Sequence, residues 1–150
     1  MSGRLEIKYY ELTYQDIEMV SAMEREFFST PWSEASIAHY METGNTIFVV
    51  ARHGEETIGY AAVFCILDEG NLISIGVHGN YRKMGIATEL LDIVYDMAHE
   101  RGVTSINLEV RTGTEAAIAL YEKEGFVQNG RRKDFYRKPT EDALLFIKEL

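Results

Sequence analysis

Residues 71–88 restrict the fold of this chain more than any other stretch does. Residues 71–77 form an apolar, β-rich run, and a polar turn containing glycine follows directly. Residues 84–101 then carry apolar side chains at helical spacing, and Gly102 is typical of a helix end. A strand, a turn and a helix in this order place unpaired backbone N–H groups, and the positive end of a helix dipole, at the carboxyl end of the strand. The stretch therefore predicts an α/β fold with an anion site at the turn, suited to phosphate.

The remaining pattern predicts about seven strands and four helices in one domain, residues 1–150. An antiparallel meander comes first and βαβ units follow, which indicates a mixed α/β sheet with helices on both faces. Period-two alternation and β-rich runs predict strands at residues 5–9, 46–51, 57–67, 71–77, 105–110, 126–132 and 143–150.

Cap residues define the starts of the other helices. Thr13, with Asp16 three residues later, predicts a capping box, and Ile17, Val20 and either Met23 or Glu24 follow at helical spacing to about residue 28. A short second helix is expected after Ser33, and a fourth helix is expected from Thr114 to Glu124.

Composition excludes several classes of protein. The net charge of −9 argues against nucleic acid as a partner, since phosphate binding requires a basic face. No apolar run approaches the roughly 20 residues of a membrane span, and the first residues lack the apolar core of a signal peptide. The single cysteine, Cys65, agrees with a reducing cytoplasm, and the four histidines lack metal-ligand spacing. We expect a cytoplasmic protein without a metal.

In so acidic a chain, an anion must be held by a local feature, and Arg82 and Lys83 lie in the turn. A plain helix start with solvated basic side chains would give the same pattern. A P-loop is excluded because no Gly-Lys-Ser/Thr is present, and Gly76, Gly79 and Gly85 do not have the spacing of a dinucleotide fingerprint.

Several motifs together resemble the GCN5-related N-acetyltransferase (GNAT) superfamily. The run from Arg82 through Gly85 to Ala87 fits its Arg/Gln-x-x-Gly-x-Gly/Ala loop, and residues 108–111 and 116–126 look like the second half of its signature. Phe28 with Pro-Trp-Ser, and Asp-Phe-Tyr at residues 134–136, resemble protein N-terminal acetyltransferases of the ribosomal-protein-alanine acetyltransferase (RimI) and Ard1 type. The resemblance covers nearly the whole chain.

The resemblance implies that acetyl-CoA is the co-substrate. Ile75 and Val77 would lie along the pantetheine arm, with backbone N–H groups pairing to the cofactor and polarising the thioester. The cofactor-binding residues implied are Ile75, Gly76, Val77, Arg82, Lys83, Met84, Gly85, Ile86, Ala87, Thr88 and Thr114. Relatives often have Asp-Pro where this chain has His78-Gly79, and asparagine where it has Thr114. We expect an altered turn at His78, which is either a base or, as we favour, a solvated loop side chain.

The resemblance assigns the catalytic roles to Glu109 and Tyr121. Alternation along residues 105–110 puts Glu109 on the face opposite Leu108 and Val110, where it could also be an ordinary solvent-facing side chain. A base is needed because a peptide α-amine has a pKa of about 7.7–8.0 and must lose a proton before it attacks. Tyr121, which could equally be a core tyrosine, would donate a hydrogen bond to the departing sulfur.

Two aromatic segments are expected to enclose the acceptor through Phe28, Pro31 and Tyr136. We therefore predict direct acetyl transfer to a protein or peptide N-terminus, with a ribosomal protein or nascent chain among the candidates. A small-molecule amine or a lysine side chain remains an alternative acceptor. A non-catalytic acetyl-CoA-binding module is the third alternative.

Overall fold

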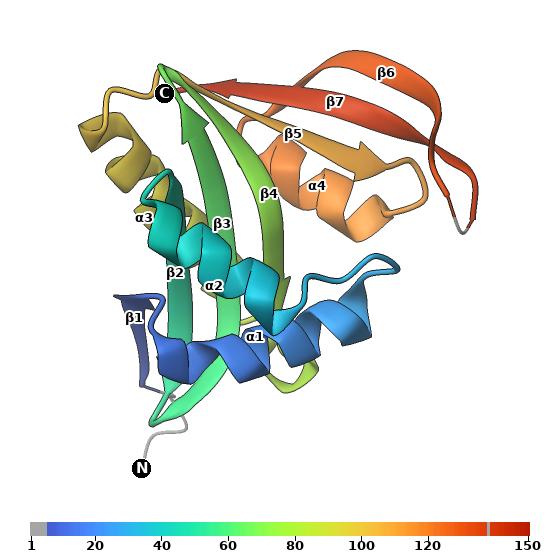
Figure 1. Ribbon diagram of the computed structural model, residues 1–150. Helices are drawn as coiled ribbons and strands as arrows, with labels where there is room; N and C mark the ends of the chain where they lie inside the picture. Colours follow the sequence, from blue (N-terminus) through green and yellow to red (C-terminus); the bar gives the residue numbers. More distant parts are fainter. Residues whose placement is uncertain (1–5, 138) are drawn as a thin grey trace.

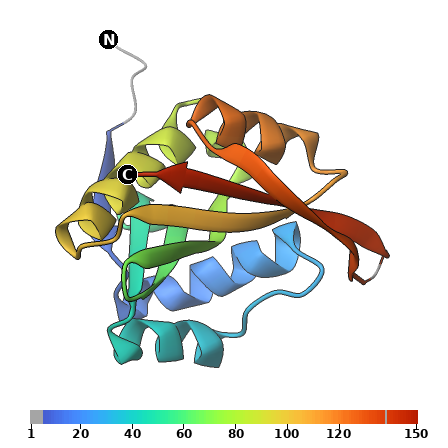
Figure 2. The ribbon, with the colours of Figure 1, turned by 90° about the horizontal axis from the view of Figure 1, so that it is seen from above.

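A seven-stranded mixed sheet forms the centre of the structure, with two helices on each face (Figures 1 and 2). The computed structural model describes residues 6–137 and 139–150. Its elements in chain order are β1 (Ile7–Glu11), α1 (Tyr14–Phe27), α2 (Glu34–Thr43), β2 (Thr46–His53), β3 (Glu56–Ile66), β4 (Glu69–Val77), the 3₁₀ turn η1 (Gly79–Tyr81), α3 (Ile86–Glu100), β5 (Ser105–Arg111), α4 (Glu115–Lys123), β6 (Val127–Tyr136) and β7 (Glu141–Glu149).

The strand order is β1-β2-β3-β4-β5-β7-β6, and all neighbours are antiparallel except β4 and β5. The parallel ladder of β4 and β5 covers only residues 69–71 of β4, which pair with residues 105–107 of β5. Beyond this short ladder the two strands diverge, and Figure 1 shows β5, β7 and β6 turning away from the first four strands. The predicted mixed sheet of seven strands with helices on both faces is confirmed.

The α1 and α2 face of the sheet is held by its own apolar core. Val20, Met23 and Ile37 from these helices pack against Phe48 and Tyr60 of β2 and β3. Burying a large apolar side chain stabilises a fold by about 1.5–3 kcal/mol, so this cluster is enough to fix both helices on the sheet.

The opposite face carries α3 and α4 (Figure 2). Leu90, Leu91 and Val94 of α3 are fully buried against β2 and β3, while Tyr121 and nearby Phe126 bring the α4 end into the same core. Val94 lies on the buried face of α3, whereas the neighbouring Ile93 is only partly buried.

Helix ends agree with the sequence at three positions. The Asp16 carboxylate accepts the backbone N–H of Thr13 at 2.9 Å, which completes the expected capping box of α1. The Ser33 hydroxyl accepts the N–H of Ser36 at 3.1 Å and caps α2. Gly102 follows α3 with a φ of 85°, as expected of a residue that ends a helix in the left-handed region.

Other boundaries differ from the predictions. The first strand is Ile7–Glu11 instead of residues 5–9, and Leu5 lies outside the described residues. The strand β6 extends four residues beyond the predicted end, to Tyr136, because β7 continues to pair with it across two register shifts. None of the helices within residues 6–137 and 139–150 combines the length and apolar character that a membrane span requires.

Candidate active site

The second half of β4 presents its backbone at the opening between β4 and β5. On one side β4 pairs with β3 up to Val77, and a register shift leaves Ile73 as an extra residue in a bulge. On the other side the ladder with β5 has already ended at Asn71. Since strand edges carry alternating N–H and C=O groups, residues 72–77 offer a free edge to which an extended ligand can add.

The side chains of this segment are used for packing. Ile75 and Val77 pack against the core on the α3 face. Gly76 has no room for a side chain, because an added Cβ would lie 2.8 Å from the Tyr60 ring and 3.0 Å from that of Phe27. The three residues predicted to bind the cofactor therefore have mainly their backbone groups available for it.

A compact turn connects β4 to α3. His78 Nδ1 accepts the backbone N–H of Asn80 at 3.2 Å, so this histidine shapes η1, which the sequence did not predict. Lys83 and Gly85 both have left-handed backbone conformations, with φ of 63° and 78°. A Cβ at Gly85 would meet no protein atom within 4 Å, so its positive φ is the feature of the turn that favours glycine there.

The first turn of α3 supplies unpaired donors to this turn. The first intrahelical bond runs from the Glu89 N–H to the Gly85 carbonyl at 3.0 Å. The amides of Ile86, Ala87 and Thr88 therefore belong to the unpaired N-terminal set, at the positive end of the helix dipole. The Ile86 side chain is buried in the core, so only its backbone can reach a ligand.

The basic side chains of the turn are placed differently from each other. Arg82 donates from Nε to the Val77 carbonyl at 3.1 Å, and its guanidinium lies 4.9 Å from the centre of the Phe27 ring. Lys83 and Met84 are exposed. Arg82 therefore joins the turn to the end of β4, at the opening of the sheet.

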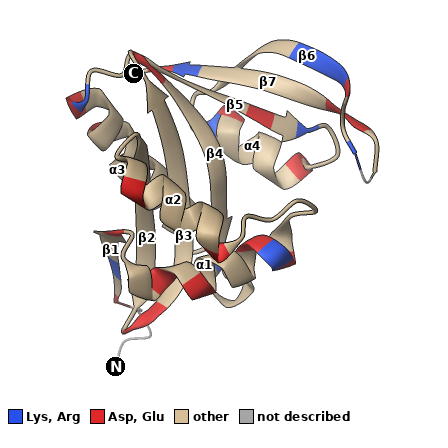
Figure 3. Ribbon diagram, viewed as in Figure 1, with Lys and Arg blue, Asp and Glu red and all other residues tan. Residues whose placement is uncertain are grey.

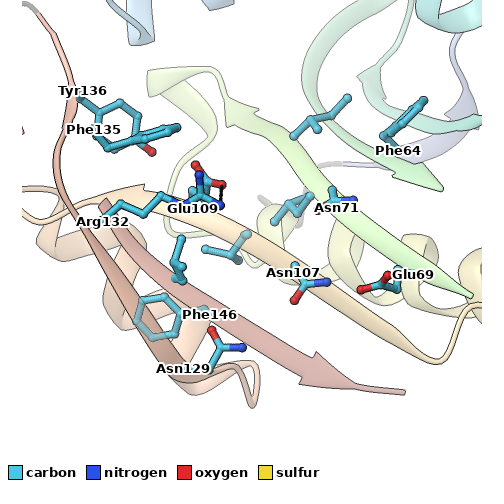
Figure 4. Close-up of a pocket in the computed structure, with 14 residues that line it drawn as sticks. Phe64, Glu69, Asn71, Asn107, Glu109, Asn129, Arg132, Phe135, Tyr136 and Phe146 are labelled. Carbon is cyan, nitrogen blue, oxygen red and sulfur yellow. Dashed lines mark ion pairs between the residues drawn. The ribbon is translucent and has the colours of Figure 1, made fainter. Parts of the chain in front are cut away.

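A cleft of about 630 Å³ lies along β4, β5, β6 and β7, and Figure 4 shows the side chains that line it. Glu109 extends into it from β5, on the face opposite buried Leu108 and Val110, as the alternation predicted. Arg132 of β6 lies across the cleft with Nη2 3.8 Å from Glu109 Oε1. Arginine and lysine are concentrated on this part of β6 (Figure 3), within a chain of net charge −9.

Tyr121 belongs to α4 on the other side of β5. It is 8% exposed, and its ring packs edge-on against Phe126 at 5.7 Å between centroids. Burial, together with the nearby Tyr136, raises the pKa of Tyr121 to about 12. Among the described residues its hydroxyl has no hydrogen-bond partner, so a protonated donor is available at this position.

Tyr136 connects the two groups electrostatically. Burial raises the pKa of Tyr136, the Glu109 carboxylate raises it further, and the Arg111 guanidinium opposes the shift. Glu109 therefore acts on Tyr136 from the cleft, and Tyr136 acts on Tyr121. Glu109 and Tyr136 line the cleft together with Leu72 and Ile73 of β4, while Tyr121 lies on the α4 side of β5.

The remaining predicted site residues lie at element ends. Phe28 is the C-cap of α1 and is 40% exposed, and Pro31 is exposed in the loop that follows. Trp32 in the same loop is structural, since its ring stacks on Tyr40 at 5.0 Å. Thr114 is the N-cap of α4, as predicted, but its hydroxyl makes no capping hydrogen bond.

Sequence reasoning missed three residues that organise this region. Arg111 bridges two loops, Arg132 faces Glu109, and Glu24 is a buried carboxylate that accepts hydrogen bonds from Tyr60 and Ser74. Helical spacing offered Glu24 only as an alternative to Met23, and both are buried. The signal available for Arg111 was its position two residues after Glu109, on the same face of the strand.

No cluster of three or more His, Cys, Asp or Glu suited to a metal ion occurs within the described parts of the chain. The arrangement supplies backbone donors, a helix N-terminus, a carboxylate and a phenol. These groups can bind an anionic, extended ligand and transfer protons beside it.

The sequence matches the model of the acetyltransferase (GNAT) family over residues 17–126. It is 33% identical to the [ribosomal protein bS18]-alanine N-acetyltransferase of Escherichia coli K12 over 128 residues, 85% of this chain and 84% of the relative. It is also 33% identical to the N-alpha-acetyltransferase RimI of Mycobacterium tuberculosis over 138 residues, 88% of this chain and 85% of that protein. The crystal structure of the ribosomal-protein-S18-alanine N-acetyltransferase from Escherichia coli superposes with a TM-score of 0.87 at 28% identity, covering 96% of this chain and 94% of that one.

The chain belongs to the acetyltransferase (GNAT) family. It is an N-acetyltransferase that takes its acetyl group from acetyl-CoA, and the resemblance found in the sequence is confirmed. The roles of individual site residues remain predictions.

Proposed function

We propose that this enzyme transfers the acetyl group of acetyl-CoA to the N-terminal α-amino group of proteins or peptides. The observation that carries the proposal is the cleft beside the open edge of β4, which Glu109 and Tyr136 line together with Leu72 and Ile73 of β4. Relatives that cover most of the chain are named as an alanine N-acetyltransferase and an N-alpha-acetyltransferase, which supports an α-amine as the acceptor.

In this proposal, the donor occupies the opening between β4 and β5. Backbone groups of residues 72–77 pair with the pantetheine arm as an added strand would. The pyrophosphate is held by amides at the start of α3 and in the turn from Arg82 to Thr88. In this turn the positive φ of Gly85 leads the chain into the helix. Thr114, with an uncommitted hydroxyl at the start of α4, is the remaining candidate contact.

The reaction is a direct attack within a ternary complex. The α-ammonium of the acceptor loses one proton to Glu109, directly or through water, which leaves a neutral amine. The amine nitrogen attacks the thioester carbonyl, the C–N bond forms, and the C–S bond breaks. Tyr121 donates a hydrogen bond, and finally a proton, to the departing coenzyme A sulfur. Its pKa of about 12 keeps it protonated for this role across the physiological range. The second proton that the attacking nitrogen loses as the amide forms passes through water to the Tyr121 phenolate and restores the phenol, and Glu109 releases its own proton to solvent.

The acceptor occupies the cleft along β4, β5, β6 and β7, whose volume of about 630 Å³ has room for the first residues of a peptide. Tyr136 lines this cleft, and Phe28 and Pro31, which are exposed at the α1–α2 loop, are the residues that we propose as an extension of its entrance. A ribosomal protein or nascent chain with an N-terminal alanine is the acceptor that we propose to test first, because the Escherichia coli relative is named for that residue. We propose further that residues 1–150 act as one domain and that the enzyme works in the cytoplasm.

The experiment is acetylation of peptides beginning with Ala, Ser, Thr or Met, followed by mass localisation of the acetyl group. Acetyl on the α-amine supports the proposal, whereas acetyl on lysine alone, or turnover of small amines only, contradicts it. Tyr121→Phe and Glu109→Gln are expected to fold normally and to lose about a hundredfold in kcat. Tyr14→Phe is the control, since Tyr14 is exposed on α1 and its hydroxyl donates to Glu42 of α2, away from the residues that line the cleft. Full activity in both site variants would disprove the assigned roles.

A further inference from the structure

Arg111, the last residue of β5, contacts two loops that are far apart in the sequence. Its Nη2 donates to the Ser29 hydroxyl, in the α1–α2 loop, at 3.0 Å. The same nitrogen donates to the Arg137 carbonyl at 3.0 Å, and Nη1 donates to the Pro139 carbonyl at 3.0 Å, both in the β6–β7 hairpin. One guanidinium therefore joins the hairpin that follows Tyr136, a residue of the cleft, to the α1–α2 loop that we propose as an extension of the cleft entrance.

The Arg111 side chain is also stacked and paired. Its guanidinium lies 4.3 Å from the centre of the Tyr136 ring, and Nη1 lies 3.4 Å from Glu141 Oε1. Arg111 and Glu141 are only 21% and 25% exposed, so this pair is more shielded than the Arg132–Glu109 pair. A planar guanidinium can satisfy several acceptors and an aromatic face together, which a lysine ammonium cannot do.

Glu141 extends the bridge to the start of α4. Its Oε2 accepts the Gly113 N–H at 2.7 Å and the Thr112 hydroxyl at 3.3 Å. Gly113 approaches so closely that an added Cβ would lie 2.8 Å from Oε2. The turn that begins the Tyr121 helix is thus tied, through one carboxylate, to the same arginine.

We propose that Arg111 is a positioning residue for the acceptor: it holds the α1–α2 loop against the β6–β7 hairpin and so sets the width of the acceptor entrance. The inference rests on the proposed function, because it concerns the peptide that enters there. Arg111 acts through Ser29 and Tyr136. Within residues 6–137 and 139–150, no other hydrogen bond or ion pair joins the α1–α2 loop to the hairpin. Without the bridge, the acceptor must therefore order the two segments when it binds.

The test compares Arg111→Lys with the wild-type enzyme in steady-state peptide acetylation. The variant keeps the positive charge and loses the planar fork. We expect the KM for the peptide to rise about tenfold, kcat to change less than threefold, and the dissociation constant of acetyl-CoA to stay the same. Arg131→Gln is the matched control, because Arg131 lies on the same hairpin but pairs at 2.6 Å with Asp142. It is expected to leave the KM unchanged.

Ser29→Ala removes only the contact between loops, at an exposed position that does not endanger folding. It is expected to raise the peptide KM about threefold in the wild-type background, and to have no further effect in the Arg111→Lys background. An unchanged KM in Ser29→Ala, strictly multiplicative effects in the double variant, or an equal loss of acetyl-CoA affinity would overturn the inference.

Hydrogen exchange separates this inference from the proposed function. Amides of residues 28–33 should exchange faster in Arg111→Lys and Ser29→Ala than in the wild-type enzyme. If the wild-type enzyme acetylates no peptide α-amine, the proposed function fails, and the bridge is still judged by this measurement. If exchange of residues 28–33 is unaltered in both variants, the bridge itself is refuted.

Discussion

Glu109 and Tyr121 lie on opposite sides of β5 in different surroundings. The Glu109 side chain is 36% exposed in an open cleft, while Tyr121 is 8% exposed in the core. A carboxylate retains its charge near water, and a buried phenol retains its proton. The two environments therefore suit a proton acceptor and a proton donor, although both side chains had ordinary structural explanations in the sequence.

The pH dependence of catalysis should reflect this difference. We expect kcat/KM to rise through about pH 8, as the acceptor α-amine becomes neutral, and to stay level to at least pH 10. Tyr121 would begin to ionise near pH 10 if its pKa were ordinary, but its pKa of about 12 preserves the donor. Initial rates from pH 6 to 10.5 provide the measurement. A decline centred near pH 10 that disappears in Tyr121→Phe would contradict the raised pKa.

Arg132 should weaken the attraction of the cleft for a cationic acceptor. Its guanidinium lies 3.8 Å from Glu109, and both side chains are largely solvated. We expect Arg132→Gln to lower the peptide KM about two- to threefold at low ionic strength, with the effect fading in about 0.5 M salt. Peptide KM values at several salt concentrations provide the check. A higher KM in the variant would instead mean that Arg132 binds the acceptor.

Helix ends were the elements best predicted from sequence. Asp16 accepts the backbone N–H of Thr13, and Ser33 accepts that of Ser36, at the starts of α1 and α2. Gly102 adopts the left-handed conformation that ends α3. These features depend only on residues that are close in the sequence. The length of β6 could not be predicted in this way, because it depends on pairing with β7 across register shifts. The same applies to η1, which His78 stabilises with a side-chain hydrogen bond.

Two glycines at the ends of α3 offer a matched comparison. Gly85 and Gly102 have φ of 78° and 85°, and neither would place a Cβ within 4 Å of another atom. Alanine at either position should lower the free energy of unfolding by about 1–2 kcal/mol, since a left-handed backbone strains residues with a Cβ. Only Gly85→Ala should also weaken acetyl-CoA binding, measured by calorimetry. Equal acetyl-CoA affinities in the two variants would argue against an anion site at residues 82–88.

At the scale of the whole molecule, a buried ion pair between Asp16 and Arg52 connects α1 to the sheet. Arg52 of β2 donates to Asp16 at 2.7 and 2.9 Å, and the Thr57 hydroxyl of β3 donates to it at 2.7 Å. Burial opposes ionisation of this carboxyl, but the hydrogen bonds outweigh it and lower the pKa of Asp16 below its ordinary 3.8. The ionised group therefore stabilises the fold above about pH 4, and this contribution disappears as the pH falls through the folded-state pKa.

Asp16→Asn should thus cost about 3 kcal/mol of unfolding free energy at pH 7, because it leaves Arg52 unpaired. The difference from the wild-type protein should narrow progressively below pH 4. Urea unfolding at pH 7, 5, 4 and 3 measures it, with Asp96→Asn, an exposed aspartate on α3, as the control. A difference that is constant across this range would show that the charge of Asp16 is not what stabilises the fold.

The general fold and the family could be predicted because periodicity and spaced motifs are properties of the chain itself. For the site, motifs in the sequence offered candidates at Glu109, Tyr121 and the turn around Gly85, and the roles of these residues stay predictions. Arg111 connects residues 29 and 139, and Glu24 connects residues 32, 60 and 74. Contacts between distant segments leave no local signal, so these networks became visible only in three dimensions.

The short ladder between β4 and β5 divides the sheet into two parts. The turn and helix proposed to hold the donor belong to the β4 side, whereas much of the cleft for the acceptor comes from β5, β6 and β7. Only residues 69–71 pair across the division. Substitutions in the β6–β7 hairpin can therefore retune acceptor choice while the donor half stays unaltered. In evolutionary terms, enzymes built in this way can change the acceptor that they acetylate and keep acetyl-CoA as the donor.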